Sequence, residues 1–265
     1  MTKRRSAFAS WPSEHATADL LPIECTPSTA AEILEAVPFW FHTFSLSKAA
    51  GIYTPGVARD HGYRLASIPE SFEDQSVLDV GTFDGFYAFL AEHRGAARVV
   101  AVDNEQYRHW VRDRWGIDLQ GAEGFKAIAA LLASEVRYER MDALDLATWT
   151  TRFDVIFCFG ILHRVRNPFG LLKVLTGLLA PGGRLLIETA GIEHDAGAGH
   201  GAMAVPHPRE VNARDDYFYW QFSSGSLAHL AEFLGCAFET HSTPIVDGQP
   251  RLVGHINAAT PANED

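Results

Sequence analysis

Three acidic residues occupy positions where they could bind a nucleoside. Asp79 and Asp103 each stand at the end of an apolar, strand-like run, and Asp142 follows a third strand candidate at 136–139. In open α/β sheets, ligands bind at the carboxyl ends of the strands. Asp103 follows Gly81 by 22 residues, a spacing at which a carboxylate can accept hydrogen bonds from both ribose hydroxyls. Asp142 is placed to accept a hydrogen bond from an exocyclic adenine amine.

The loop after the first run reads Gly81-Thr82-Phe83-Asp84-Gly85. It lacks the GxGxxG spacing of a pyrophosphate-binding loop, and the carboxylates of Asp79 and Asp84 would repel phosphates. The same carboxylates suit a nucleoside with a cationic end, which indicates S-adenosylmethionine; the alternative is that the acids merely end strands or cap helices. The residues expected to bind this cofactor are Asp79, Gly81, Thr82, Gly85, Asp103, Asn104, Asp142, Ala143 and Phe159.

The elements that must position these residues alternate between strand and helix. The pattern predicts strands at 77–80, 98–102, 136–139, 155–159 and 184–188, and helices at 86–93 and 169–179. A helix at 224–234 and strand-like runs near 237–240 and 252–256 follow. This alternation predicts an α/β fold with a doubly wound, mostly parallel sheet.

The segments VLDVGTFDG, VVAVD, MDA, FDVIFCFGILH and LAPGGRLLIET occur in this order between about residues 75 and 190. Together they resemble the class I methyltransferases. The resemblance implies a Rossmann-like, seven-stranded sheet with an antiparallel last hairpin, and S-adenosylmethionine as the methyl donor. We expect a helical N-terminal cap over 1–70, a methyltransferase domain over 71–265, and a substrate-side loop or lid at 191–222.

A narrower resemblance rests on Trp40-Phe41-His42-Thr43, Thr54-Pro55-Gly56 and the run from Ile161 to Pro168. These segments are similar to the tRNA wobble-uridine modifying branch and its small-molecule relatives. In the tRNA branch an RRTEW-like segment helps to hold a carboxylated donor and RNA, whereas this chain has only Arg251 near that region. A basic cluster at Arg108, His109, Trp110, Arg112 and Arg114 is either an RNA contact or a solvated helix face.

Composition narrows the classes of partner. The chain has 22 Lys and Arg against 33 Asp and Glu, a formal charge of −11, which argues against nucleic-acid and anionic-membrane binding. Its three cysteines form no CxxC pair, so neither a disulfide framework nor a thiolate zinc site is predicted. With no apolar run of signal-peptide or membrane-spanning length, we expect a soluble, cytoplasmic protein.

Two histidines are candidate catalytic bases. His163 follows the strand end where the acceptor normally meets the methyl group, and His42 lies in an aromatic segment that would cover the donor. A neutral imidazole can accept the proton that an amine must lose before it is methylated. The alternatives are a loop histidine that orients backbone and a histidine that only packs. His194, His200 and His207 fit no rigid element, and no metal site is predicted.

Acidic and aromatic residues crowd the region after 187, in a pattern that suits a polyamine or aminosugar. The substrate-binding candidates are Glu188, Glu210, Asp215, Asp216, Tyr219 and Trp220. We therefore expect a transferase that N-methylates a cationic, aminoglycoside-like small molecule in antibiotic biosynthesis. The alternatives are O-methylation of another natural product, tRNA wobble-uridine modification, and a non-catalytic module that binds the nucleoside. The sequence does not predict an oligomeric state.

Overall fold

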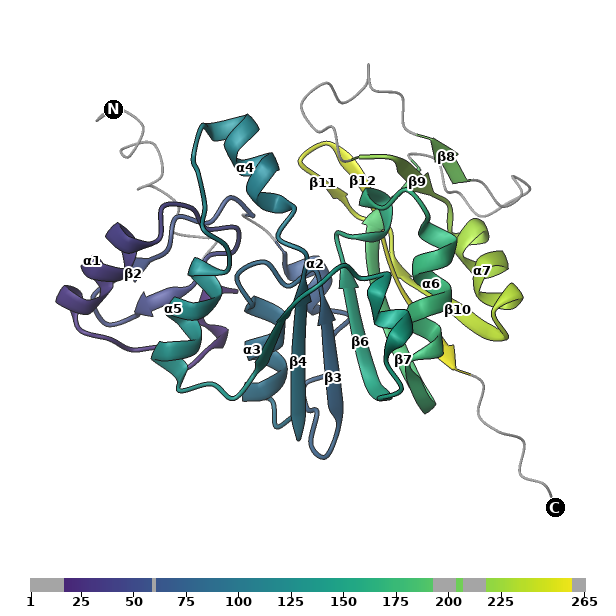
Figure 1. Ribbon diagram of the computed structural model, residues 1–265, viewed down its shortest axis with the longest axis horizontal. Helices are drawn as coiled ribbons and strands as arrows, with labels where there is room; N and C mark the ends of the chain where they lie inside the picture. Colours follow the sequence, from purple (N-terminus) through teal and green to yellow (C-terminus); the bar gives the residue numbers. More distant parts are fainter. Residues whose placement is uncertain (1–16, 59–60, 193–203, 207–217, 259–265) are drawn as a thin grey trace.

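The computed structural model describes residues 17–58, 61–192, 204–206 and 218–258. A central sheet has the spatial strand order β10-β12-β7-β6-β3-β4-β5 (Figure 1). These strands are β3 (Ser76–Val80), β4 (Arg98–Asp103), β5 (Arg137–Arg140), β6 (Phe153–Phe159), β7 (Leu179–Ala190), β10 (Cys236–Ser242) and β12 (Gln249–Ala258). A short strand, β11 (Ile245–Val246), pairs with β12.

The sheet confirms the expected fold class. β7, β6, β3, β4 and β5 run parallel, whereas β12 is antiparallel to both β7 and β10. Several boundaries differ from the prediction, and the largest difference is at β7, which begins at Leu179 and not at Arg184. The ladder with β6 pairs Phe153 with Leu179 and then Val155 with Arg184, so the segment 180–183 bulges out before regular pairing resumes.

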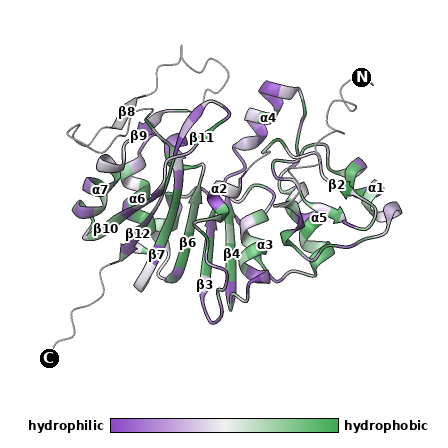
Figure 2. Cartoon of the chain, turned by 180° about the vertical axis from the view of Figure 1, so that it is seen from behind, coloured by the Kyte–Doolittle hydropathy of each residue, from purple (hydrophilic) through white to green (hydrophobic). Residues whose placement is uncertain are grey.

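Helices cover both faces of the sheet (Figure 1). α3 (Phe86–His93) and α5 (Glu123–Leu132) pack on one face, and α6 (Pro168–Gly177) and α7 (Ser224–Phe233) on the other. Helix α4 (Tyr107–Trp115) lies above the carboxyl edge of the sheet, and the 3-10 turns are η3 (Asp145–Thr148) and η4 (Leu162–Arg164). The Asn167 and Ser223 side chains cap α6 and α7 by accepting from backbone N–H groups. Figure 2 shows α4 as largely hydrophilic and α5 as largely hydrophobic, which matches an exposed and a packed helix.

The side-chain alternation of the strands divides the core between the two faces. Val77 and Val155 belong to a cluster with α3 and α5, whereas Leu78 and Ile156 belong to a cluster with α6 and α7. This period of two is what parallel strands buried on both faces require. The carboxyl ends of β3, β4 and β6 are thereby fixed next to one another.

The segment before the sheet joins the first of these clusters. It contains η2 (Ala18–Leu20), α1 (Pro27–Ala36), a hairpin of β1 (Ser45–Ser47) and β2 (Ile52–Tyr53), and α2 (Gly62–Leu65). Trp40, Phe44 and Leu46 are buried in the same core as Phe86 and Leu90 of α3. The segment therefore packs against the central sheet and brings Phe41 and His42 to its carboxyl edge.

Two further strands lie in the expected lid region, β8 (Ala204–Pro206) and β9 (Trp220–Phe222), which pair antiparallel. The rest of that region, 193–203 and 207–217, is outside the described residues. Within the described part of the chain, no helix is long and apolar enough to cross a membrane.

Candidate active site

A cavity of about 200 Å³ opens at the carboxyl ends of β3, β4 and β6. Five of the expected cofactor residues line it: Gly81, Asp103, Asn104, Asp142 and Ala143. A larger hollow of about 780 Å³ lies along β4 and β5, but none of the expected site residues lines it. The smaller cavity is therefore the candidate active site.

Four of the expected cofactor residues are not part of the cavity wall. Asp79, Thr82, Gly85 and Phe159 do not line it. Asp79 is buried, and this burial raises the pKa of its carboxyl to about 7.

The turn after β3 passes close to Ile161 at Gly81. Gly81 has φ +77°, and an added Cβ would lie 2.2 Å from Cδ1 of Ile161. The turn after β3 therefore needs glycine both for its conformation and for this close approach.

Asp103 is held rigidly at the end of β4. Its Oδ2 accepts from the backbone N–H of Phe83 at 2.9 Å, and its Oδ1 accepts from that of Glu105 at 2.6 Å. Burial raises the pKa of the carboxyl to about 6. Each carboxylate oxygen still has a further lone pair, so the two oxygens can accept from a pair of ribose hydroxyls.

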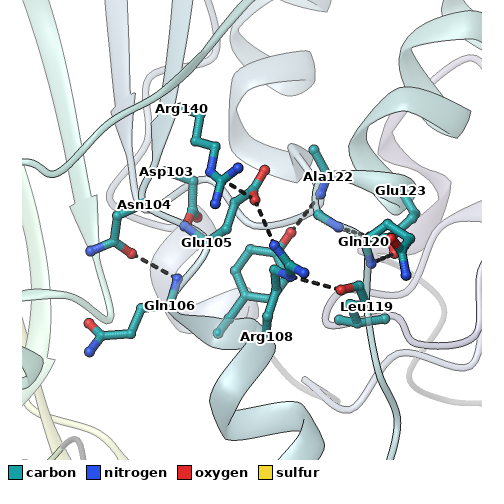
Figure 3. A network of polar contacts seen from close by, with 12 residues as sticks. Asp103, Asn104, Glu105, Gln106, Arg108, Leu119, Gln120, Ala122, Glu123 and Arg140 are labelled. Carbon is teal, nitrogen blue, oxygen red and sulfur yellow. Dashed lines mark hydrogen bonds and ion pairs between the residues drawn. The ribbon is translucent and has the colours of Figure 1, made fainter.

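A polar network fixes the turn between β4 and α4, beside Asp103 (Figure 3). The buried Glu105 carboxylate pairs with Arg140 at 3.1 Å and with Arg108 at 3.7 Å. Arg108 also donates through Nε to the carbonyl of Leu119 at 2.8 Å. Arg108 therefore has partners within the protein, and it is neither a solvated side chain nor available for an RNA contact, the two interpretations of the basic cluster on α4.

A second polar contact joins the ends of neighbouring strands. Asn104 donates through Nδ2 to Oδ2 of Asp142 at 3.0 Å, and Asp142 also accepts from the Leu144 backbone N–H at 2.9 Å. These contacts bring the expected ribose and adenine partners to one wall of the cavity.

Three aromatic rings line the same part of the cavity. Phe83 and Tyr107 stack with their ring centroids 3.9 Å apart, and Phe41 stacks on Phe83 at 5.0 Å. Phe83 lies in the loop after β3 with φ +54°. Sequence reasoning missed Phe83 and Tyr107, although aromatics beside a nucleoside loop are a usable signal because flat rings pack well against a base.

His42 reaches the cavity from the N-terminal segment. Its Nδ1 contacts Oδ1 of Asp84, while Oδ2 of Asp84 accepts from the backbone N–H groups of Phe41 at 2.9 Å and His42 at 2.8 Å. The imidazole is buried, and its Nε2 has no hydrogen-bond partner among the described residues. An Asp–His pair in this arrangement can hold an imidazole with one ring nitrogen ready to accept a proton.

His163 does not lie where a base would be needed. Its ring is fully buried, with Nδ1 3.2 Å from Oγ1 of Thr189, and it packs against Phe218. Nδ1 also accepts from the backbone N–H of Ala190 at 3.3 Å. Because His163 does not line the cavity and its Nδ1 already supports the backbone, the expected role as base is corrected to a structural one.

Glu188 also differs from its expected role. It is fully buried between two guanidinium groups, with Oε2 2.7 Å from Arg64 and Oε1 2.5 Å from Arg251. Burial raises the pKa of this carboxyl, but the two arginines outweigh burial and hold the pKa below its usual value. Both oxygens are occupied, so Glu188 is not an open contact for a substrate ammonium.

The other substrate candidates lie apart from this cavity or beyond the described residues. Tyr219 and Trp220 are half-buried and do not line it; the Tyr219 backbone N–H donates to the carbonyl of His163. Glu210, Asp215 and Asp216 fall outside the described residues, as do His194, His200 and His207. Among the residues that are described, no group of three or more His, Cys, Asp or Glu could hold a metal ion.

Comparison with known proteins identifies relatives in sequence and solved structures with a similar fold. A tRNA U34 carboxymethyltransferase of Chromohalobacter salexigens is 30% identical over 195 residues, covering 71% of this chain and 50% of the relative. A protein of the same name from Methylococcus capsulatus is 30% identical over 163 residues, covering 58% of this chain and 43% of the relative. The chain thus spans about half the length, or less, of these curated relatives.

Solved structures share the fold at low sequence identity. The N-terminal domain of EvdMO1 with SAH bound has a TM-score of 0.60 at 20% identity, covering 89% of this chain and 98% of that one. YcgJ from Bacillus subtilis has a TM-score of 0.56 at 14% identity, covering 75% and 99%. The family described as "Methyltransferase domain" matches residues 53–241, a range that includes every residue that lines the cavity except Phe41 and His42. Since this match spans well over half of the chain, the protein belongs to the methyltransferase domain family.

Proposed function

We propose that this protein transfers a methyl group from S-adenosylmethionine to a nitrogen or oxygen of a small molecule, with His42 as the general base. The observation that carries the proposal is the buried His42–Asp84 pair at the wall of the cavity. Asp84 occupies Nδ1 of the imidazole, which leaves the lone pair of Nε2 to accept the proton of the attacking group.

The residues at the strand ends fit the proposed donor. Asp103 offers two carboxylate oxygens to the ribose, and Asp142 is exposed at the neighbouring strand end. The aromatic cluster of Phe41, Phe83 and Tyr107 lines the same cavity and gives the adenine an apolar wall. When it is bound, S-adenosylmethionine supplies an electrophilic methyl group. The protein's own task is to align the acceptor with that methyl group and to remove the acceptor's proton.

For the acceptor we keep the aminosugar of an aminoglycoside pathway as the first version of the proposal. Its support is the formal charge of −11 and the acidic and aromatic residues that follow Glu188 in the sequence. The paired state of Glu188 removes one expected contact from this version. The aminosugar version of the proposal therefore depends on the acidic residues Glu210, Asp215 and Asp216.

Modification of tRNA is a second candidate, because relatives at 30% identity are named tRNA U34 carboxymethyltransferase. Arg112 and Arg114 are exposed on α4 and could contact RNA. The charge of −11 opposes this candidate, since a protein that binds RNA gains affinity from a basic surface.

The test is a transfer assay with labelled S-adenosylmethionine on three acceptor classes: aminoglycosides, phenols and undermodified tRNA. We expect label in the aminoglycosides, and a strong loss of label with His42→Asn. Labelled tRNA would establish the second candidate instead. Binding of S-adenosylhomocysteine without transfer to any acceptor would contradict an enzyme and favour a nucleoside-binding module.

A further inference from the structure

The central sheet ends at β5 in a regular, open edge. Within the described part of the chain, β5 pairs only with β4, and its ladder has no register shift from Arg137 to Arg140. The opposite edge strand, β10, has a register shift between Thr240 and Ser242, an irregularity of the kind that protects sheet edges from further pairing. The edge of β5 is therefore the better template for an additional strand.

The backbone groups of β5 alternate between β4 and the open side. The Met141 N–H donates to the carbonyl of Asp103 at 3.0 Å. Because a parallel ladder repeats every two residues, Glu139 and Arg137 also turn their N–H and C=O groups towards β4. Tyr138 lies between them and turns its N–H and C=O groups to the open side. Among the described residues neither group has a hydrogen-bond partner, so Tyr138 offers one donor and one acceptor to an incoming strand.

The side chains of β5 divide between a packed face and an open face. Tyr138 packs on Phe125 of α5, with the ring centroids 4.9 Å apart. Arg137 and Glu139 point to the other face, where they pair with each other at 2.5 Å and line the hollow of about 780 Å³. The chain passes from β5 to β6 through the 3-10 turn η3 and no described helix, so this charged pair stays accessible beside the open edge.

A second copy of this chain complements the edge across a two-fold axis. When two β5 strands pair antiparallel with Tyr138 opposite its equivalent, each Tyr138 N–H donates to the carbonyl of the other. Arg137 of each copy then lies opposite Glu139 of the other copy, in a pair whose Cα atoms are about 4.5 Å apart. Four charges of alternating sign thus meet across the axis.

The charges also select this register. The next registers that the backbone allows place Glu139 opposite Glu139, or Arg137 opposite Arg137, and like charges directly opposite each other are destabilising. Charged side chains on an edge strand normally prevent pairing with other chains. Here their order makes a copy of the same strand complementary, and it disfavours a strand that lacks this pattern.

We propose that β5 is a dimerisation edge, at which two copies of this chain pair antiparallel about Tyr138 and are held in register by Arg137 and Glu139. The central sheet then continues from one copy into the other. Because β5 has only four residues, the interface is small and the dimer is reversible.

Sedimentation of the full chain over a range of concentrations measures this dimer. Wild-type protein should show a monomer–dimer equilibrium. Arg137→Glu and Glu139→Arg each replace two attractive pairs by two repulsive ones, so each variant should dimerise at least about tenfold more weakly. Glu232→Arg is the matched control, because it makes the same change of charge as Glu139→Arg at an exposed position of α7. It should leave the equilibrium unchanged.

An equimolar mixture of the two variants separates pairing between copies from a disturbance within one copy. Arg137→Glu carries two glutamates on this face and Glu139→Arg carries two arginines, so neither variant keeps the ion pair within its own strand. Only a mixed dimer brings opposite charges together. We expect heterodimers about as tight as the wild-type dimer, whereas a merely structural disturbance would leave the mixture as weakly associated as its components.

Amide hydrogen exchange of wild-type protein keeps the test decisive even if a variant does not fold. The Tyr138 amide should exchange more slowly as the protein concentration rises, and the amides of β10 should not change. The proposal is overturned if wild-type protein is monomeric at every concentration, if it dimerises without protecting the Tyr138 amide, or if Glu139→Arg dimerises as tightly as Glu232→Arg.

Discussion

At the scale of single residues, Asp84 connects two parts of the site that are 42 positions apart in the sequence. It belongs to the loop after β3, yet its carboxylate binds two backbone N–H groups and the imidazole of the N-terminal segment. A buried carboxylate needs such partners, because an uncompensated charge in the interior is costly. The loop that would hold the donor and the proposed base are therefore positioned by the same side chain.

Replacing His42 should separate proton transfer from binding. We expect His42→Asn to lower the turnover number about 10²- to 10⁴-fold, the usual contribution of a general base, and to leave the affinity for S-adenosylhomocysteine near that of wild-type protein. The loss should shrink at high pH, where the acceptor loses its proton unaided. The measurement is a single-turnover pH–rate profile, and an equal loss at every pH would mean that His42 only positions the acceptor.

Replacing Asp103 should weaken the nucleoside contact. Asp103→Asn keeps the size of the side chain but exchanges one acceptor oxygen for a donor, so we expect a loss of about 1.5–3 kcal/mol for each charge-assisted hydrogen bond to the ribose. Calorimetric titration with S-adenosylhomocysteine measures it. Asp145→Asn is the control, since Asp145 is exposed and does not line the cavity. Equal affinities of both variants and wild-type protein would remove Asp103 from the site.

At the scale of elements, the turn between β3 and α3 depends on the absence of a side chain at Gly81. Gly81→Ala adds left-handed strain and a contact with Ile161, whereas Gly116→Ala, at φ +67° with open space around it, adds the strain alone. The strain costs roughly 1–2 kcal/mol. Chemical denaturation should therefore show a greater loss for Gly81→Ala, together with weakened nucleoside binding. Equal losses would show that Ile161 moves aside freely.

The strands of the central sheet and the helices α3, α6 and α7 were predictable because each carries a local pattern, whereas α5 and the short hairpin β1–β2 were not predicted. Strand β6 is apolar throughout, and α3 has the bounds that its sequence predicts, Phe86–His93. What local pattern does not encode is the direction of a side chain at a strand end. His163 was placed correctly at the end of β6 but its ring lies inside, and the partners of Glu188 come from residues 64 and 251, far away in the sequence. Tertiary packing decides such pairings.

At the scale of the whole molecule, the buried charges around the cavity are of two kinds. On the proposed donor side, burial raises the pKa of Asp79 to about 7 and that of Asp103 to about 6, so ionising these carboxyls opposes folding. On the other side, Arg64 and Arg251 keep Glu188 ionised. A cationic donor would favour the ionised form of the first group, and binding would then offset the cost of their burial.

This distribution predicts how stability changes with pH. Because the pKa of Asp79 is higher in the folded state than its ordinary value of 3.8, the folded state holds the proton more tightly between pH 3.8 and about 7. The contribution of Asp79 to stability is therefore full below pH 3.8 and falls as pH rises towards 7. Buried histidines such as His61 have a lowered pKa, so their contribution to stability rises with pH. The measurement is therefore the difference in unfolding free energy between wild-type protein and Asp79→Asn, because the histidine contributions are the same in both proteins and cancel. We expect the unfolding free energy of wild-type protein to fall relative to that of the variant as pH rises from 4 to 7. A difference that does not change with pH would show that Asp79 titrates at its ordinary pKa.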